Sequence, residues 1–146
     1  MKMILAFALG LLALPVFGQD WRADTCGTSL AQAYSSFAAR AGARTSGDFN
    51  GDGQADFAFL LDNLSAHTSA IGVCLSGEPR PLLITAPYRA GKIFTKPKGT
   101  AYTSPETKQK GFYEVDAIAV SDGGRIGASY VLRAGVFARV VDGAEL

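Results

Sequence analysis

The part of the sequence best suited to chemistry is a short acidic segment, residues 48–56, whose alternate positions carry oxygen atoms. A hard divalent cation of calcium's size binds about six to eight oxygen ligands, and a tight turn can aim alternate side chains at one centre. Side-chain oxygens stand at the first, third, fifth and ninth positions, and the seventh offers a main-chain carbonyl. In order, these residues are Asp48, Asn50, Asp52, Asp56 and, for the carbonyl, Gln54. The spacing predicts a Ca2+ site.

Two glycines let this segment turn tightly. Gly53 stands at the sixth position, where the chain must bend sharply, and Gly51 relieves crowding in the same turn. Magnesium suits the segment less well, because it demands a stricter octahedron and keeps its water ligands. The alternative is an acidic turn that holds no metal, in which the carboxylates repel one another with nothing to neutralise them.

The same segment carries a family resemblance. Its start has EF-hand spacing, but Phe59 stands where an EF-hand has a bidentate Glu, and the segment that follows is typical of a strand. Residues 47–61 instead resemble the calcium loop of FG-GAP or VCBS-type repeats, as in the integrin α-chain propeller. The resemblance implies that the five residues above are the calcium ligands. With a single copy and no Phe-Gly-Gly-Ala-Pro segment, the chain offers no basis for a propeller or an adhesive role.

The chain has two cysteines, Cys26 and Cys74. Export to an oxidising compartment predicts a disulfide between them. Such a crosslink would close a loop of 48 residues, and chain entropy assigns it roughly 4 kcal/mol of stability. Two buried free thiols are the alternative. Redox catalysis has no support, because the spacing is not Cys-x-x-Cys.

The N-terminus predicts export. Lys2 precedes an almost wholly apolar run, residues 3–16, and cleavage is expected before Gln19. We therefore predict a signal peptide over residues 1–18, a single calcium-binding domain over 19–146, and a periplasmic or secreted location. A retained membrane anchor is the alternative, but the run is shorter than a spanning helix requires. After cleavage no stable membrane insertion is expected.

Charge gives no indication of a nucleic-acid partner. The chain has 14 basic and 13 acidic side chains, and the predicted cleavage removes Lys2, which makes the two numbers equal. Basic residues are nevertheless concentrated between positions 79 and 110, where the only acidic residue is Glu106. This basic strip consists of Arg80, Arg89, Lys92, Lys96, Lys98, Lys108 and Lys110. It is either a binding surface, with aromatic residues interleaved, or an ordinary solvated face.

The pattern of apolar residues predicts one helix followed by strands. A helix is expected over residues 29–41, with Ser29 and Gln32 at capping-box spacing and Gly42 as its stop. Its apolar side would consist of Leu30, Tyr34, Phe37, Ala38 and Ala41. We therefore predict an α+β fold, in which this N-terminal helix packs on a mostly antiparallel, twisted β-sheet. The calcium loop would join the two and hold the helix against the first strand.

From Arg44 onward, short runs of β-favouring residues divided by Gly, Pro, Asn and Asp predict short strands. They are expected at residues 55–61, 70–75, 81–85, 92–95, 112–120, 127–133 and 136–141. Turns at residues 121–124 and at Ala134-Gly135 make the last three an antiparallel meander. Residues 94–111 predict either a long loop or a pair of short strands.

Other candidate sites are weaker. His67 is the only histidine and is expected at the surface, since no acid or nucleophile can be tied to it. Glu114 and Asp116, two residues apart, could form a carboxylate pair, but ordinary exposed polarity of a strand is the favoured interpretation, because no pocket or partner acid is identifiable from the sequence. We expect a non-enzymatic interaction module with a protein or glycan partner in the envelope or exterior. A small periplasmic or secreted hydrolase is the alternative.

Overall fold

The computed structural model describes residues 20–86, 89–104, 107–122 and 127–140 of the protein. Within these ranges a single helix, α1 (Ala23–Ala33), accompanies ten strands. The predicted α+β class is therefore wrong, because the molecule is mostly β and several antiparallel sheets take the place of one. The predicted signal peptide, residues 1–18, lies outside the described residues.

Three sheets make up the β structure, and every pair of neighbouring strands is antiparallel. Sheet A contains, in order, β1 (Phe37–Gly47), β2 (Asp56–Asn63), β3 (Ser69–Cys74) and β4 (Leu82–Thr85). Sheet B contains, in order, β10 (Val136–Val140), β9 (Gly127–Arg133), β8 (Ala117–Ser121) and β5 (Lys92–Lys96). A hairpin is formed by β6 (Ala101–Thr103) and β7 (Lys110–Phe112).

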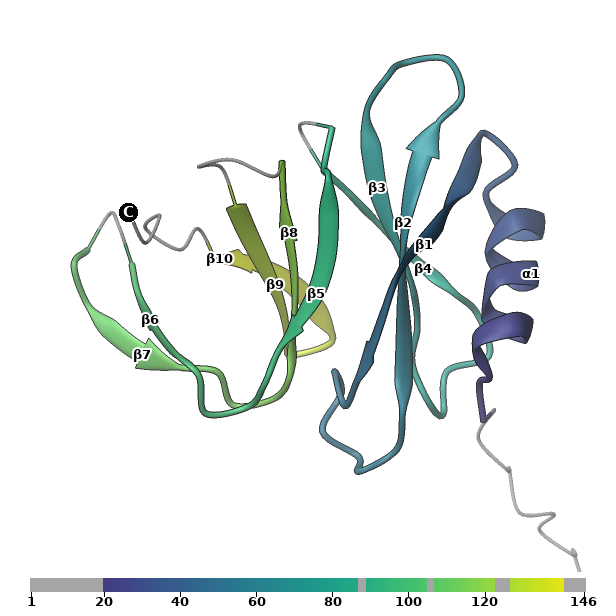
Figure 1. Ribbon diagram of the computed structural model, residues 1–146. Coiled ribbons are helices and arrows are strands. Elements are labelled where there is room, and N and C mark those ends of the chain that lie inside the picture. The colour runs from purple at the N-terminus through teal and green to yellow at the C-terminus, as the bar shows by residue number, and fades with distance from the viewer. Residues whose placement is uncertain (1–19, 87–88, 105–106, 123–126, 141–146) are drawn as a thin grey trace, which may run out of the picture.

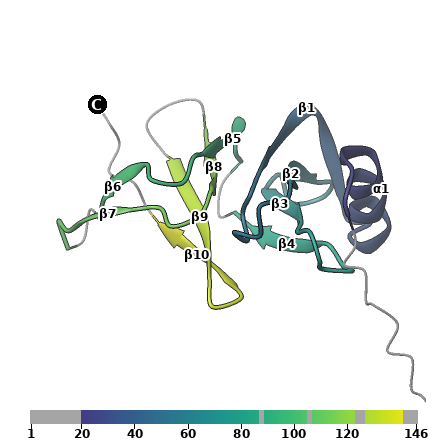
Figure 2. The ribbon, with the colours of Figure 1, turned by 90° about the horizontal axis from the view of Figure 1, so that it is seen from below.

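The elements stack in layers. Helix α1 covers the outer face of sheet A, sheet B packs on the inner face, and the β6–β7 hairpin lies beyond sheet B (Figures 1 and 2). The main core fills the space between the two sheets, with Leu60 and Ile71 from sheet A against Ile118 and Val120 from sheet B. Removing these side chains from water stabilises the fold by roughly 1.5–3 kcal/mol each.

The predicted helix is misplaced. Helix α1 begins at Ala23 and ends at Ala33, and the chain from Phe37 onward is strand β1 instead of helix. Cys26 and Leu30, one helical turn apart, are the buried residues of α1. Residues 37–43 are rich in alanine and favour helix locally, but the pairing of residues 37–39 and 44–47 with β2 overrides that propensity.

Strand β1 is bent by an irregularity in its pairing. Ala39 pairs with Leu61 and Arg44 with Phe59, so the intervening residues bulge from the ladder. Arg40, inside the bulge, donates through Nε to Asp62 Oδ2 at 2.9 Å and through Nη1 to the Ala90 carbonyl at 2.6 Å. The bulge therefore ties sheet A to the chain that enters β5.

Most predicted strands are confirmed, and one is divided. The predicted strand 112–120 is split into β7 and β8, because residues 113–116 leave the ladder. The pair of short strands within residues 94–111 is confirmed as β6 and the start of β7. The last three strands, β8, β9 and β10, form the predicted antiparallel meander. Its second turn has positive φ at Ala134 and Gly135, as expected for a two-residue hairpin; the end of the first turn lies outside the described residues.

Candidate metal-binding loop

The acidic segment is the connection between β1 and β2. Gly47 pairs with Asp56 in the last rung of the ladder, so the residues between them close a β-hairpin at one end of sheet A. Phe49, in this loop, is fully buried in the core between the sheets and anchors the loop to it. The prediction that the loop joins a helix to a strand is therefore wrong, because β1 stands between them.

The side chains of the first three predicted ligands accept hydrogen bonds from main-chain N–H groups of their own loop. Asp48 accepts the Asp52 N–H at 3.0 Å and the Gly53 N–H at 2.9 Å. Asn50 Oδ1 accepts the same Asp52 N–H at 3.2 Å. Asp52 Oδ1 accepts the Gln54 N–H at 2.8 Å. The oxygen atoms of all three side chains thus lie against consecutive main-chain N–H groups, as the bend at Gly53, with φ of 81°, requires.

Asp52 also contacts a second segment of the chain. Its Oδ2 accepts hydrogen bonds from Ser76 Oγ and, at 3.3 Å, from Asn50 Nδ2. The hydrogen bond from Ser76 is the main reason that the pKa of Asp52 lies below its ordinary value. Asp52 is therefore a carboxylate held in its charged form at the surface.

Asp56 has different surroundings. It is fully buried, and its carboxylate accepts three main-chain N–H groups, from Phe49 at 2.7 Å, Asn50 at 3.2 Å and Ser76 at 2.7 Å. Burial raises its pKa, while those hydrogen bonds act in the opposite direction. A carboxylate has about four lone-pair sites, and three are used here. Asp56 thus joins the start of the loop to the turn after β3.

The donors suit a hard cation in kind, since all are oxygen atoms. Asp48, Asn50 and Asp52 each retain acceptor capacity beyond the hydrogen bonds described above. Within the described ranges, however, no three His, Cys, Asp or Glu side chains are grouped so that they could hold a metal ion. The loop thus brings together the carboxylates of Asp48 and Asp52 and the amide of Asn50. The Asp56 carboxylate instead binds main-chain N–H groups, and Gln54 is exposed.

A small open cleft of about 150 Å³ adjoins the loop. Its lining consists of Asp48, Gly51, Lys98, Glu114, Val115 and Asp116. The candidate carboxylates Glu114 and Asp116 therefore lie beside the acidic loop, in the segment between β7 and β8. Both oxygens of Asp116 accept main-chain N–H groups, from Asp48 at 2.9 Å and from Lys98 at 2.8 Å. Asp116 thus joins three segments of the chain.

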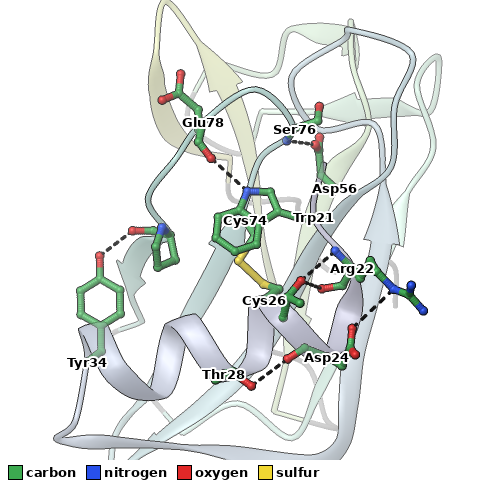
Figure 3. Close-up of a disulfide and its surroundings, with 12 residues drawn as sticks. Trp21, Arg22, Asp24, Cys26, Thr28, Tyr34, Asp56, Cys74, Ser76 and Glu78 are labelled. Carbon is green, nitrogen blue, oxygen red and sulfur yellow. Dashed lines mark hydrogen bonds and ion pairs between the residues drawn. A yellow bond between two sulfur atoms is a disulfide. The ribbon is translucent and has the colours of Figure 1, made fainter. Parts of the chain in front are cut away.

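The predicted disulfide between Cys26 and Cys74 is present and fully buried (Figure 3). It attaches α1 to the end of β3. Two residues beyond Cys74, the buried Ser76 donates its N–H to Asp56. Trp21, just before α1, donates its indole N–H to the Glu78 carbonyl at 3.0 Å, which is a second attachment of this turn to the helical segment.

The remaining candidates are dispersed. His67 is exposed in the turn between β2 and β3, as predicted. The residues of the basic strip are spread over the segments leading into β4 and β5, over β5 itself, over the connection from β5 to β6 and over the β6–β7 hairpin. Two exposed aromatic side chains accompany them, Phe94 at 42% and Phe112 at 67%.

Sequence reasoning missed Ser76 and Asp116 as partners of the loop. Both are far from it along the chain and belong to no local motif, so only contact in space identifies them. No helix in the described part of the chain is long and apolar enough to span a membrane. Comparison of the chain with protein-family models, curated proteins and solved structures finds no match.

Proposed function

We propose that this is an exported calcium-binding protein in which the ion stabilises the loop between β1 and β2. The observation that carries the proposal is the position of the Asp48, Asn50 and Asp52 oxygens over consecutive N–H groups of one tight turn. A cation there would offset the repulsion between the two carboxylates. The buried disulfide supports export, because disulfides persist in oxidising compartments.

The ion's role in this proposal is structural. The loop is anchored in the core by Phe49 and tied to both sheets through Asp56 and Asp116, so ordering it stabilises the whole sandwich. Binding to the folded state alone would add about 2.7 kcal/mol when free calcium is about 100 times its Kd. Thermal unfolding with calcium and with chelator tests this role, and an unchanged midpoint would contradict it.

Titration calorimetry tests the binding itself. The exported form is expected to release or absorb heat with millimolar calcium, and Asp52→Ala is expected to abolish that heat. Asp24→Ala, which removes an exposed carboxylate of α1, is the matched control and should bind as wild type does. No heat from the wild-type protein, or equal binding by the Asp52 variant, would rule out the loop as the site.

We further propose that the protein is a non-enzymatic interaction module with a protein or glycan partner in the envelope or exterior. Phe94 in β5 and Phe112 in β7 are exposed aromatic residues on strands that also carry lysines, and they support a binding role, because aromatic side chains are enriched at interfaces. Capture from the native envelope fraction, with calcium or with chelator, tests it. Phe112→Ala should lose the captured partner, while Leu64→Ala, at another exposed apolar residue, should keep it.

A small hydrolase is the second candidate, because Glu114 and Asp116 line one cleft. Against it, the Asp116 carboxylate is engaged by two N–H groups and is poorly placed to move a proton. Activity against ester, peptide and glycoside substrates that is lost in Glu114→Gln would favour the hydrolase. Activity unchanged in that variant would exclude this cleft as the active site.

A further inference from the structure

Ser76 contacts three of the predicted ligands from outside their loop. It lies in the turn after β3 and is buried, with 4% of its surface exposed. Its N–H donates to Asp56, its hydroxyl donates to Asp52, and its carbonyl accepts from Asn50 Nδ2 at 3.0 Å. We propose that Ser76 is a positioning residue of the calcium loop and sets its affinity for the ion. This inference rests on the calcium-binding function proposed above.

The contacts of Ser76 orient the Asn50 and Asp52 side chains. They leave Oδ1 of each side chain facing the N–H groups of the loop. Anchoring Asn50 Nδ2 at the Ser76 carbonyl directs Oδ1, at the opposite end of the amide, toward the Asp52 N–H. The hydroxyl engages Asp52 Oδ2, while Oδ1 of the same carboxylate faces the Gln54 N–H. Hydrogen bonds that orient metal ligands in this way typically change metal affinity by about 10–100-fold when removed.

The turn that carries Ser76 is held independently of the loop. Cys74, two residues earlier, is crosslinked to Cys26 in α1. The Glu78 carbonyl, two residues later, accepts the Trp21 indole N–H (Figure 3). Ser76 therefore presents its three polar groups from a rigid support, which lowers the entropic cost of ordering the ligands around an ion.

Calcium titration of Ser76→Ala tests the proposal. The exported form of this variant is expected to bind calcium at least about 10-fold more weakly than wild type. Ser76→Thr keeps the hydroxyl and is expected to restore most of the affinity. Ser69→Ala is the matched control, because Ser69 is also a buried serine that accepts an N–H, from Ala90, and contacts an aspartate, Asp62. It should lower the unfolding midpoint and leave the calcium Kd unchanged.

The possible results distinguish a failure of the Ser76 role from a failure of the proposed calcium binding. If the wild-type protein shows no heat of calcium binding in titration calorimetry, both the proposed function and the role of Ser76 are overturned. Equal Kd values for wild type and Ser76→Ala, or an equal loss in Ser69→Ala, would overturn only the role of Ser76. If Ser76→Ala does not fold, calcium titration of the ¹⁵N-labelled wild-type protein decides. A shift of the Ser76 amide resonance, with that of Ser69 unchanged, supports the proposal, and a stationary Ser76 resonance overturns it.

Discussion

Asp48 and Asp116 exchange two hydrogen bonds between the loop of sheet A and the chain entering sheet B. The Asp48 N–H donates to Asp116 Oδ2 at 2.9 Å, and the Asp116 N–H donates to the Asp48 carbonyl at 3.2 Å. The second Asp116 oxygen accepts the Lys98 N–H. Together with Ser76, which binds the loop from the β3 side, this pair holds the predicted calcium loop between the two sheets.

Removing the Asp116 carboxylate should destabilise the fold. Asp116→Ala leaves the Asp48 and Lys98 N–H groups without their acceptor, and the expected loss in the free energy of unfolding is about 1–3 kcal/mol. Urea denaturation monitored by circular dichroism measures it. Glu114→Ala is the control, because Glu114 is exposed on the same cleft. Equal stability of the Asp116 variant and wild type would contradict the structural role of Asp116.

Gly47 is required by close packing. A Cβ atom there would lie 2.9 Å from Asp116 Oδ2, 2.9 Å from Phe49 Cε1 and 3.0 Å from Thr95 Cγ2. Gly47→Ala is therefore expected to lower the free energy of unfolding by about 1–3 kcal/mol. Gly27→Ala should have the opposite sign, since that glycine lies inside α1 and its Cβ would meet only Phe59, at 3.7 Å. Chemical denaturation of both variants checks the contrast, and two changes of the same sign would refute it.

The disulfide should contribute substantially to stability. Replacing both Cys26 and Cys74 by serine removes the crosslink and is expected to cost about 2–5 kcal/mol. The midpoints of thermal unfolding for the oxidised wild type and the double variant give the measurement. In addition, the turn after β3 loses its attachment to α1, so the variant should bind calcium more weakly. A midpoint within about 2 °C of wild type would show that packing alone holds α1 in place.

Lowering the pH should reduce the free energy of unfolding, partly because Asp62 becomes protonated and loses its ion pair with Arg40. Hydrogen bonds from Arg40 are the main reason that the pKa of Asp62 lies below its ordinary value. Because the folded state favours the charged form, this contribution is complete above the unfolded pKa of about 3.9 and disappears as the pH falls through the lower folded pKa. Midpoints measured from about pH 7 to about pH 2 should therefore converge for wild type and Asp62→Asn at the acid end. A difference that does not change with pH would contradict this account.

Local patterns predicted the later strands well. The meander of β8, β9 and β10 was predicted from the turn signals at residues 121–124 and at Ala134-Gly135, which act over short distances. Residues 37–43 misled the prediction, because their alanine-rich composition favours helix, while the chain on both sides of the bulge, at residues 37–39 and 44–47, pairs with β2. A helical preference of a few tenths of a kcal/mol per residue does not outweigh the hydrogen-bonded pairing of β1 with β2.

By itself, the sequence determined the position of the tight acidic turn, the oxygen donors within it, and the two cysteines that pair. These depend on residue types at short spacings or on there being only one possible partner. Only the tertiary structure decided that the turn closes a hairpin, that Asp56 is buried against main-chain N–H groups, and that Ser76 and Asp116 hold the loop from two sides. The contacts that Ser76 and Asp116 make with this hairpin join residues 20 to 68 positions apart, and no local pattern encodes which distant chain will pack against a loop.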